Sequence, residues 1–389
     1  MNNNTECVVG VPRERKKDEG RVGMTPAGVA KAVRAGAIVL VERDAGVLSG
    51  FSDSAYANVG AIVTAAEEVW GKSDIVVKVK EPIREEYQHL LAMRGKTLFT
   101  YLHLAGSEIE LTRNLLRNEI TAIAYETVAI TGENGRTVYP LLVPMSKIAG
   151  TQAMRGAIAH HKDVRPRNLS AVIIGGGNVG EAALVRAIKE KVGFVLVYEA
   201  WDPRVRELRE EYHEFADCVK IFSLEKLDDA ISKKILGDAD IVISAPMLPG
   251  GKEAPIVLTQ KHFRIMKKGA YIADVAIDQG GSTAWTKGNP TKPGETFTRG
   301  AKKLVFSAVQ NIPGSTVPAE ATKALTDATL PYLLNMVRAR LNFSVRSDAQ
   351  VLPDDQALWL GVQTRSGKLR NRAVAELHGL LDEYSEFGM

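Results

Sequence analysis

Cysteine is scarce in this chain, which excludes the protein classes that depend on paired sulfur groups. The 389 residues include only Cys7 and Cys218, and neither belongs to a CxxC pair. A disulfide framework or a cysteine-based zinc site is therefore not expected. No other metal site is predicted, because the adjacent His160 and His161 lie in a polar segment typical of solvated side chains. The low cysteine usage is typical of the reducing cytoplasm, where we expect the protein to reside.

Long apolar runs and blocks of like charge are also missing. The sequence contains no stretch of 18 uncharged apolar residues, and its first residues lack the basic and apolar regions of a secretory signal. We therefore expect no membrane association. Lys and Arg number 50 against 46 for Asp and Glu, a formal net charge of +4, and no run of five or six like charges occurs. Nucleic acid is therefore not predicted as a partner.

The sequence does contain a regular alternation of short β-branched runs with amphipathic segments. Runs such as "CVVGVP", "AIVLVE" and "TLFTYLHLA" form a first series, and "SAVIIGGG", "GFVLVYE" and "ADIVISAP" begin a second. This pattern predicts an α/β fold with two parallel sheets in tandem. We expect residues 140–160 to form a connecting helix, and residues 321–341 to form a helix that could return the chain to the first unit.

A glycine loop is the most specific local signal in the second series. Gly175, Gly177 and Gly180 follow a strand-like run and open a helix-like one, and Glu199 ends the next predicted strand. This spacing is the dinucleotide-binding fingerprint. Gly175 permits a tight turn, Gly177 lets the backbone approach a pyrophosphate, and Gly180 allows the helix to pack closely on the strand. The helix N-terminus then presents N–H groups to the phosphates.

The residues after this loop bear on which dinucleotide is bound. A carboxylate at Glu199 can accept hydrogen bonds from the ribose hydroxyls and repels a 2′-phosphate, which favours NAD over NADP. Arg204 and Arg206 follow closely, so the sequence leaves NADP open as an alternative.

Polar side chains stand near the ends of several predicted strands. Arg21 follows the first strand, Lys78 and Lys80 end the run "DIVVKVKEP", His103 lies in "LFTYLHLAG", and Asp278 ends "GAYIADVAID". Ligands of parallel α/β folds bind outside the carboxyl ends of the strands. We therefore expect a cleft for a small anionic substrate, with cations to hold a carboxylate and an imidazole to exchange a proton near neutral pH. Lys78 and Lys80, two positions apart, are expected on one face of their strand.

Six ordered stretches carry more information than the glycine loop alone. They are "VGVPRERKKDEGRVGMTPAGV", "VKVKEP", "LFTYLHLA", "AIAYETV", "PMSKIAG" and "VAIDQGG", and the C-terminal "ALTDATLPYLLNMV" and "GVQTRSGKLRNRAVAELHGL" accompany them. Together they resemble the alanine dehydrogenases, which form a family with the NAD-binding subunit of proton-translocating transhydrogenase. The resemblance covers nearly the whole chain.

The resemblance implies two Rossmann-type, doubly wound domains separated by a cleft. Residues 1–138 and 319–389 would form the substrate domain, and residues 139–318 the NAD-binding domain. Arg21 and Lys80 would bind the substrate carboxylate and carbonyl, and Met145 would line the pocket for its side chain. His103 and Asp278 would be the acid/base pair.

The resemblance and the glycine loop together predict a set of cofactor-contacting residues. They are Ser146, Gly175, Gly177, Asn178, Val179, Gly180, Glu199, Arg204, Ser223, Pro246, Met247, Val275, Ala276, Ile277, Val309, Asn311 and Ile312.

The implied reaction is the NAD-dependent oxidative deamination of L-alanine to pyruvate and ammonia, and its reverse. Three alternatives stay open: another amino acid or an opine-type amine as substrate, a transhydrogenase-like nucleotide-binding subunit, and a catalytically silent NAD sensor. The expected partners are an amino acid, a 2-oxo acid and ammonium, together with further copies of the chain in a homo-oligomer. The short polar "HHKDVRPRNLS" replaces the glycine-rich hairpin of the family, so both a dimer and a hexamer are considered.

Overall fold

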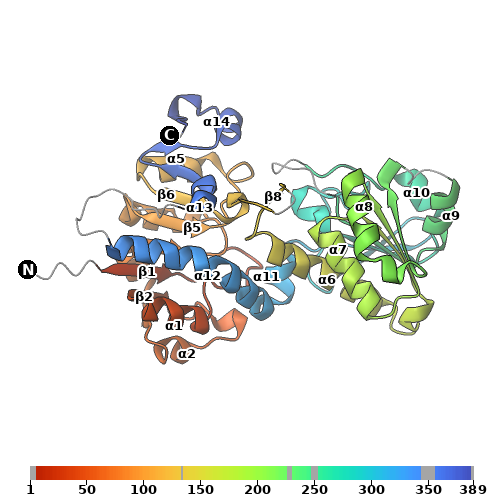
Figure 1. The fold of residues 1–389 in the computed structure, drawn as a ribbon, viewed down its shortest axis with the longest axis horizontal. Coiled ribbons are helices and arrows are strands. Elements are labelled where there is room, and N and C mark those ends of the chain that lie inside the picture. Colours follow the sequence, from red (N-terminus) through yellow and green to blue (C-terminus); the bar gives the residue numbers. More distant parts are fainter. Residues whose placement is uncertain (1–5, 133–134, 226–229, 247–252, 343–354, 387–389) are drawn as a thin grey trace, which may run out of the picture. The chain divides into compact units, whose positions relative to one another are not determined.

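The chain divides into two compact units in a computed structural model that describes residues 6–132, 135–225, 230–246, 253–342 and 355–386 (Figure 1). The first unit comprises Met1–Met145 and Val317–Met389, and the second comprises Ser146–Thr316. The first unit is therefore discontinuous in sequence. The assignment of substrate binding to one unit and cofactor binding to the other stays a prediction.

The first unit is built on a sheet for which the described residues supply eight strands in the order β17-β16-β6-β5-β4-β1-β2-β3. Strands β1 to β6 pair in parallel, whereas β16 pairs antiparallel with β6 and β17. Their bounds are Cys7–Val11 (β1), Ala37–Glu42 (β2), Ile62–Thr64 (β3), Ile75–Val77 (β4), Thr97–Thr100 (β5), Thr121–Ala124 (β6), Val362–Arg365 (β16) and Lys368–Leu369 (β17). Strands β7 (Ile130–Thr131) and β8 (Thr137–Val138) form a separate antiparallel pair.

Helices surround this sheet, and local sequence signals explain where they begin. Helix α1 starts at Thr25, whose hydroxyl accepts the Gly28 N–H, and Pro26 occupies its first position. The helix predicted at residues 321–341 is α12, and it belongs to the first unit, as expected. The helices are α1 (Pro26–Arg34), α2 (Asp53–Ala57), α3 (Ala66–Lys72), α4 (Tyr87–Leu90), α5 (Ile109–Arg117), α12 (Pro318–Asn342), α13 (Gln356–Gly361) and α14 (Arg372–His378).

The second unit has a sheet in the order β11-β10-β9-β12-β13-β15-β14 over the described residues. All its neighbouring strands pair in parallel except β14 with β15. The first strand, β9, lies in the middle and the order reverses between β9 and β12, which is the doubly wound arrangement. The bounds are Ser170–Ile174 (β9), Phe194–Glu199 (β10), Val219–Ser223 (β11), Ile241–Ser244 (β12), Tyr271–Asp274 (β13), Phe297–Arg299 (β14) and Leu304–Ser307 (β15).

The strands of this second sheet are buried on both faces. Ala171 and Ile173 of β9 belong to one apolar cluster, and Val172 and Ile174 belong to another. Such double burial is typical of parallel sheets covered by helices on either side. The helices are α6 (Val143–His160), α7 (Asn178–Lys189), α8 (Asp202–Glu211), α9 (Ala230–Asp238), α10 (Gln260–Ile265) and α11 (Ile312–Thr316). Helix α6 is the predicted connecting helix and carries the chain from the first unit into the second.

Two predicted strands are shorter than their apolar runs. The run "LFTYLHLAG" was expected to be a strand up to Gly106, but the strand ends at Thr100. The run "GAYIADVAID" was expected to be a strand up to Asp278, but the strand ends at Asp274. Beyond Thr100 the N–H groups of Leu102 and His103 donate to a carboxylate instead of a neighbouring strand. After β5 the chain forms a turn at residues 104–106, and after β13 it forms a 3₁₀ helix over Val275–Gln279.

The structure corrects the prediction that Lys78 and Lys80 lie on one face of a strand. Strand β4 ends at Val77, and the Lys78 side chain is completely buried. Its Nζ lies 2.7 Å from Glu86 Oε1 and 3.2 Å from Glu14 Oε2. Burial alone would lower the pKa of Lys78, but the two carboxylates outweigh it and raise the pKa. Lys78 is therefore an internal counter-ion and does not offer its charge to a substrate.

We expect Lys78→Met to destabilise the first unit by about 3–5 kcal/mol, because it leaves two carboxylates in the interior without their cation. The midpoint of urea unfolding measures the loss. Lys72→Met is the matched control, because its ion pair with Glu68 is on the surface and contributes little. Equal midpoints for the two variants would show that the buried pair contributes no more than the exposed one.

Candidate active site

Four polar residues of the first unit follow neighbouring parallel strands; three of them are predicted site residues, whereas Glu126 was not singled out from the sequence. Arg21 lies in the loop after β1, Lys80 after β4, His103 after β5 and Glu126 after β6. The carboxyl ends of parallel strands meet at one edge of the sheet, where ligands of such folds bind. Three of these groups interact electrostatically, because Lys80 and Glu126 both shift the pKa of His103. The fold thus brings together residues that are far apart in sequence.

Arg21 is buried and held by a carboxylate that sequence reasoning missed. Its Nε lies 2.7 Å from Glu19 Oε1, its Nη2 lies 2.5 Å from Glu19 Oε2, and its backbone N–H also donates to Glu19. Burial opposes the charge of Arg21, but Glu19 outweighs it and raises the pKa of the guanidinium. The Nη1 atom lies 3.1 Å from the Met145 sulfur. The structure therefore places the predicted carboxylate-binding and side-chain-binding residues side by side.

Lys80 is positioned through its backbone. The Glu14 carboxylate accepts the N–H of Val79 at 2.7 Å and that of Lys80 at 3.2 Å. The Thr100 hydroxyl donates to the Lys80 carbonyl at 2.9 Å. Burial raises the pKa of Glu14 to about 7, against the lowering effect of Lys78. Glu14 is a second carboxylate that no sequence pattern identified, because it acts on the backbone of a residue 66 positions away.

His103 stands in a strained turn beside Glu126. Its φ angle is +45°, in the left-handed region that residues other than glycine and asparagine seldom adopt. Its N–H donates to Glu126 Oε1 at 2.6 Å, and its ring stacks on that of Tyr101 with centroids 5.7 Å apart. The imidazole Nδ1 lies 3.9 Å from Glu126 Oε1. His103 is not a core residue, since 44% of its side chain is accessible.

The charge state of His103 follows from its surroundings. Reduced hydration of the packed ring is the largest effect and lowers the pKa below the ordinary 6.5, and Lys80 lowers it further. Glu126 raises it but does not compensate. The imidazole is therefore mostly neutral at pH 7 and able to accept a proton.

The glycine loop of the second unit has the geometry of a phosphate cradle. Gly175 has a φ of +98°, and a Cβ there would lie 2.5 Å from the Ala245 carbonyl oxygen. A Cβ at Gly180 would lie 1.7 Å from the Gly175 oxygen, whereas a Cβ at Gly177 would meet nothing within 4 Å. The space beside Gly177 adjoins the first turn of α7, whose N–H groups have no partner within the helix. These residues fit a pyrophosphate.

Glu199 and Arg204 lie next to this loop. The Glu199 carboxylate accepts the Gly176 N–H at 2.6 Å and the Trp201 N–H at 2.9 Å. Each carboxylate oxygen can accept more than one hydrogen bond, so Glu199 retains acceptor capacity for ribose hydroxyls. Arg204 Nε donates to the Gly176 carbonyl at 3.0 Å. The two side chains therefore flank the loop, where the sequence predicts the adenosine ribose.

Most of the remaining predicted cofactor residues lie at or after the carboxyl ends of strands of the second unit. Ser146 lies in α6 instead, and Met247 lies outside the described residues. The others are Ser223 at the end of β11, Pro246 after β12, Val275, Ala276 and Ile277 after β13, and Val309, Asn311 and Ile312 after β15; Asn178 and Val179 open α7.

Asp278 has a defined partner in the second unit. The backbone N–H of Asn311 lies 3.2 and 3.1 Å from its two carboxylate oxygens. The turn that carries Asp278 is fixed by Asp274, whose carboxylate accepts the N–H groups of Ala276 and Ser282 and the hydroxyls of Ser282 and Thr286. Asp274 is a further residue that the sequence did not reveal as important.

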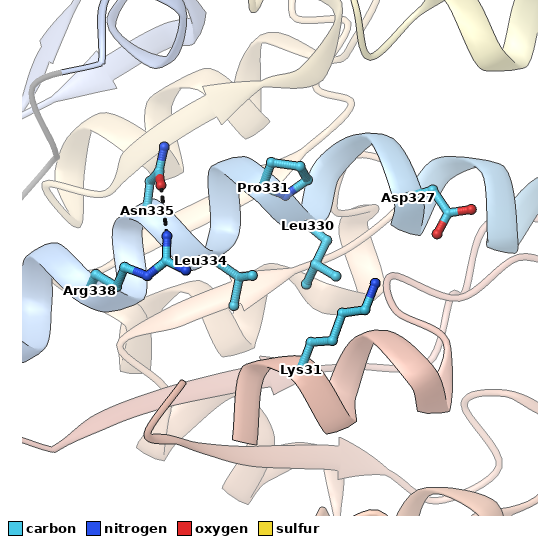
Figure 2. Close-up of a pocket in the computed structure, with 7 residues that line it drawn as sticks. All are labelled: Lys31, Asp327, Leu330, Pro331, Leu334, Asn335 and Arg338. Atoms are coloured by element: carbon cyan, nitrogen blue, oxygen red, sulfur yellow. Dashed lines mark hydrogen bonds between the residues drawn. The ribbon is translucent and has the colours of Figure 1, made fainter. Parts of the chain in front are cut away.

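A hollow on the first unit lies apart from these residues. Figure 2 shows it between α1, which contributes Lys31, and α12, which contributes Asp327, Leu330, Leu334 and Arg338. Its charged side chains are exposed, and none of the predicted site residues lines it. Over the described part of the chain, no helix is long and apolar enough to cross a bilayer, and no group of three or more His, Cys, Asp or Glu side chains has the arrangement of a metal site.

We expect Gly177→Ala to weaken nucleotide binding and Gly180→Ala to destabilise the fold. The alanine at 177 has room in the free protein, so thermal unfolding should be unchanged while affinity for NADH falls at least tenfold, because the methyl group occupies the space of the pyrophosphate. The alanine at 180 collides with the Gly175 carbonyl, so it should lower the unfolding temperature. Isothermal titration with NADH and differential scanning calorimetry measure the two effects. Unchanged NADH affinity in Gly177→Ala would exclude this loop as the binding site.

Comparison with known proteins agrees with this geometry. The family model described as alanine dehydrogenase/PNT, N-terminal domain, matches residues 10–149, and that of the C-terminal domain matches residues 147–372. The chain is 38% identical to the alanine dehydrogenase of Staphylococcus saprophyticus, covering 95% of this chain and 96% of that protein. It is 37% identical to the alanine dehydrogenase of Bacillus subtilis, covering 95% and 94%.

Solved structures extend the comparison to the fold. A structure of an L-alanine dehydrogenase superposes with a TM-score of 0.80 at 33% identity, over 96% of this chain and 99% of that one. A transhydrogenase from Sinorhizobium meliloti superposes with a TM-score of 0.75 at 20% identity, over 94% and 99%, which supports the fold alone. From the two matching domain models and the relatives of nearly equal length, the chain belongs to the alanine dehydrogenase/PNT family.

Proposed function

We propose that this protein is an L-alanine dehydrogenase, which oxidatively deaminates L-alanine to pyruvate and ammonia and catalyses the reverse reaction. The observation that carries the proposal is the convergence of Arg21, Lys80 and His103 at one edge of a parallel sheet. Relatives of nearly the same length bear this activity in their names. The overall conversion takes L-alanine, an oxidised pyridine nucleotide and water to pyruvate, ammonium and the reduced nucleotide, with release of one proton.

The glycine loop and Glu199 support NAD as the nucleotide. The loop offers backbone N–H groups and open space for the pyrophosphate, and the Glu199 carboxylate favours free ribose hydroxyls over a 2′-phosphate. When bound, the nicotinamide supplies the acceptor for the hydride that leaves the substrate Cα. We propose that Gly175, Gly177 and Gly180 hold the pyrophosphate of this nucleotide and that Glu199 holds its ribose.

Arg21 and Lys80 would bind and orient the substrate. One edge of the Arg21 guanidinium is occupied by Glu19, whereas Nη1 faces Met145. We propose that this second edge contacts the substrate carboxylate, so that the Met145 thioether packs beside the small side chain of alanine. Lys80 adds a positive charge for the carboxylate and for the developing carbonyl oxygen. Burial of Arg21 strengthens its charge interactions, because little water competes.

His103 would handle the proton of the hydrolytic step. Once the Cα–H bond has broken, the substrate carries an iminium carbon that water attacks. Neutral His103 accepts a proton from that water and then returns it to the amine nitrogen. The C–N bond breaks as the hydroxyl group gives up its proton and becomes the carbonyl, and the departing ammonia takes up that proton as ammonium. The proton that the overall conversion releases is the one that the alanine ammonium loses before the Cα–H bond breaks. The lowered pKa keeps the imidazole in the accepting form. We propose Asp278, with its carboxylate oriented by the Asn311 N–H, as the second acid/base group.

One assay separates this function from the alternatives. NADH oxidation is followed with a panel of 2-oxo acids, with and without ammonium. Ammonium-dependent turnover of pyruvate supports the proposal, and preference for another acceptor or a primary amine identifies a different substrate. Silence with every acceptor supports a nucleotide-binding role without catalysis. The homo-oligomeric state and the cytoplasmic location stay predictions.

We expect His103→Ala to lower kcat for pyruvate amination by a factor on the order of 10²–10⁴, the usual contribution of an acid/base group. Its affinity for NADH should be unchanged, since the residues proposed to bind the nucleotide belong to the second unit and His103 belongs to the first. Stopped-flow turnover and NADH titration measure the two quantities. His213→Ala, which removes an exposed imidazole of the second unit, is the control. A His103→Ala enzyme with the unaltered rate would refute this role for the imidazole.

For Arg21→Ala we expect mainly a raised KM for pyruvate, because the proposed contact with the substrate carboxylate is lost. The same change leaves Glu19 buried without its cation, so Arg21→Lys is measured in parallel to retain the charge. Both variants should raise KM at least tenfold. Arg15→Ala is the control, since Arg15 lies in the same loop as Arg21 but pairs with Glu42 at the end of β2. A KM that stays constant in both Arg21 variants would contradict the assignment.

A further inference from the structure

Arg204 is held between two carboxylates of the second unit. Its Nη2 lies 2.7 Å from Glu181 Oε2, and its Nη1 lies 3.4 Å from Glu207 Oε2. With Nε on the Gly176 carbonyl, all three nitrogens of the guanidinium have a protein acceptor. About a fifth of the side chain is exposed, 18% for Arg204 and 20% for Glu181. The positive charge of Arg204 beside the glycine loop is thus already paired within the protein.

Glu181 is itself firmly placed. It lies in the first turn of α7, one residue after Gly180, and its Oε1 accepts the Tyr212 hydroxyl at 3.1 Å. Glu181 also shares a hydrogen bond with Glu211. Desolvation and the nearby Glu181 charge raise the pKa of Glu211, so that it stays protonated to higher pH. Tyr212 and Glu211 therefore hold the Glu181 carboxylate toward Arg204, so the ion pair is not the loose contact of two surface side chains.

The ion pair between Arg204 and Glu181 opposes the binding of a nucleotide that carries a 2′-phosphate, in addition to the repulsion by Glu199. In dinucleotide folds, a carboxylate at the end of the second strand repels a 2′-phosphate, and a nearby arginine accommodates it. Glu199 supplies the repulsion here. Arg204 is in the position to supply the attraction, but two of its nitrogens are paired with Glu181 and Glu207. Binding of a 2′-phosphate would then require both removal of the repulsion and release of the arginine.

We propose that Glu181 is a specificity-determining residue, which keeps Arg204 from binding a 2′-phosphate and so reinforces the selection of NADH by Glu199. The inference rests on the proposed binding of a pyridine nucleotide at the glycine loop. Glu181 acts through Arg204 and is a positioning residue.

A double-mutant cycle tests the proposal by direct binding of NADH and NADPH, followed by calorimetric titration. Glu199→Ser removes the repulsion and should gain only a few-fold in NADPH affinity. Glu181→Gln alone should gain little, because Glu199 still repels the phosphate. The double variant should bind NADPH at least tenfold more tightly than the product of the two single effects predicts. Glu181→Asp, which shortens the side chain by one methylene, should give a smaller gain in the same direction and serves if the glutamine variant unfolds.

The two arginines of α8 provide matched controls. In the double variant, Arg204→Met should abolish the gain in NADPH affinity, whereas Arg206→Met, which removes an exposed arginine of the same helix, should leave it. Additive effects of the two glutamate changes, or a gain that survives Arg204→Met, would overturn the role of Glu181. Absence of NADH binding to the unaltered protein would instead refute the proposed function.

Discussion

The candidate site depends on carboxylates that accept backbone N–H groups just beyond the ends of parallel strands. A strand that leaves its sheet loses the neighbour that accepted its N–H groups, and buried donors without partners are costly. Glu14 supplies the acceptor after β4, Glu126 after β5, and Asp274 after β13. Each of these carboxylates fixes the turn that carries a proposed functional residue, namely Lys80, His103 or Asp278.

The same carboxylates determine the electrostatics of the first unit. A buried carboxylate is tolerable only with a cation or several donors. Lys78 serves Glu14 and Glu86, and Arg21 serves Glu19. Lys78 is therefore withdrawn from any ligand, whereas Arg21 keeps one edge toward Met145. Two lysines two positions apart thus differ: Lys78 is an internal counter-ion, whereas Lys80 is proposed to bind the substrate. Both lie beyond the end of β4 at Val77.

Sequence reasoning succeeded where a signal is local and repeats with the period of an element. The strands, α6, α12 and the loop from Gly175 to Gly180 are of this kind, and the structure confirms them. The prediction that Lys78 lies on the same strand face as Lys80 was wrong, and the predicted strand that ends at Thr100 was drawn too long. A buried ion pair and a strand end both depend on partners distant in sequence. Glu19 and Asp274 were not singled out for the same reason. A carboxylate that accepts backbone N–H groups leaves no periodic trace.

The return of the C-terminal segment to the first unit completes the support of Arg21. The loop between Val22 and Thr25 has no strand neighbour, and its N–H groups donate to Thr322 and Thr326 of α12 at 3.1 and 3.0 Å. Both hydroxyls are buried, so water does not replace them as acceptors. Arg21 is thereby held by Glu19 through its side chain, and the loop that follows it is held by threonine hydroxyls of α12. A substrate carboxylate that binds Arg21 would then meet a cation already in place, which reduces the entropy lost on binding. Residues about 300 positions away are therefore as necessary to the geometry of this site as those beside it.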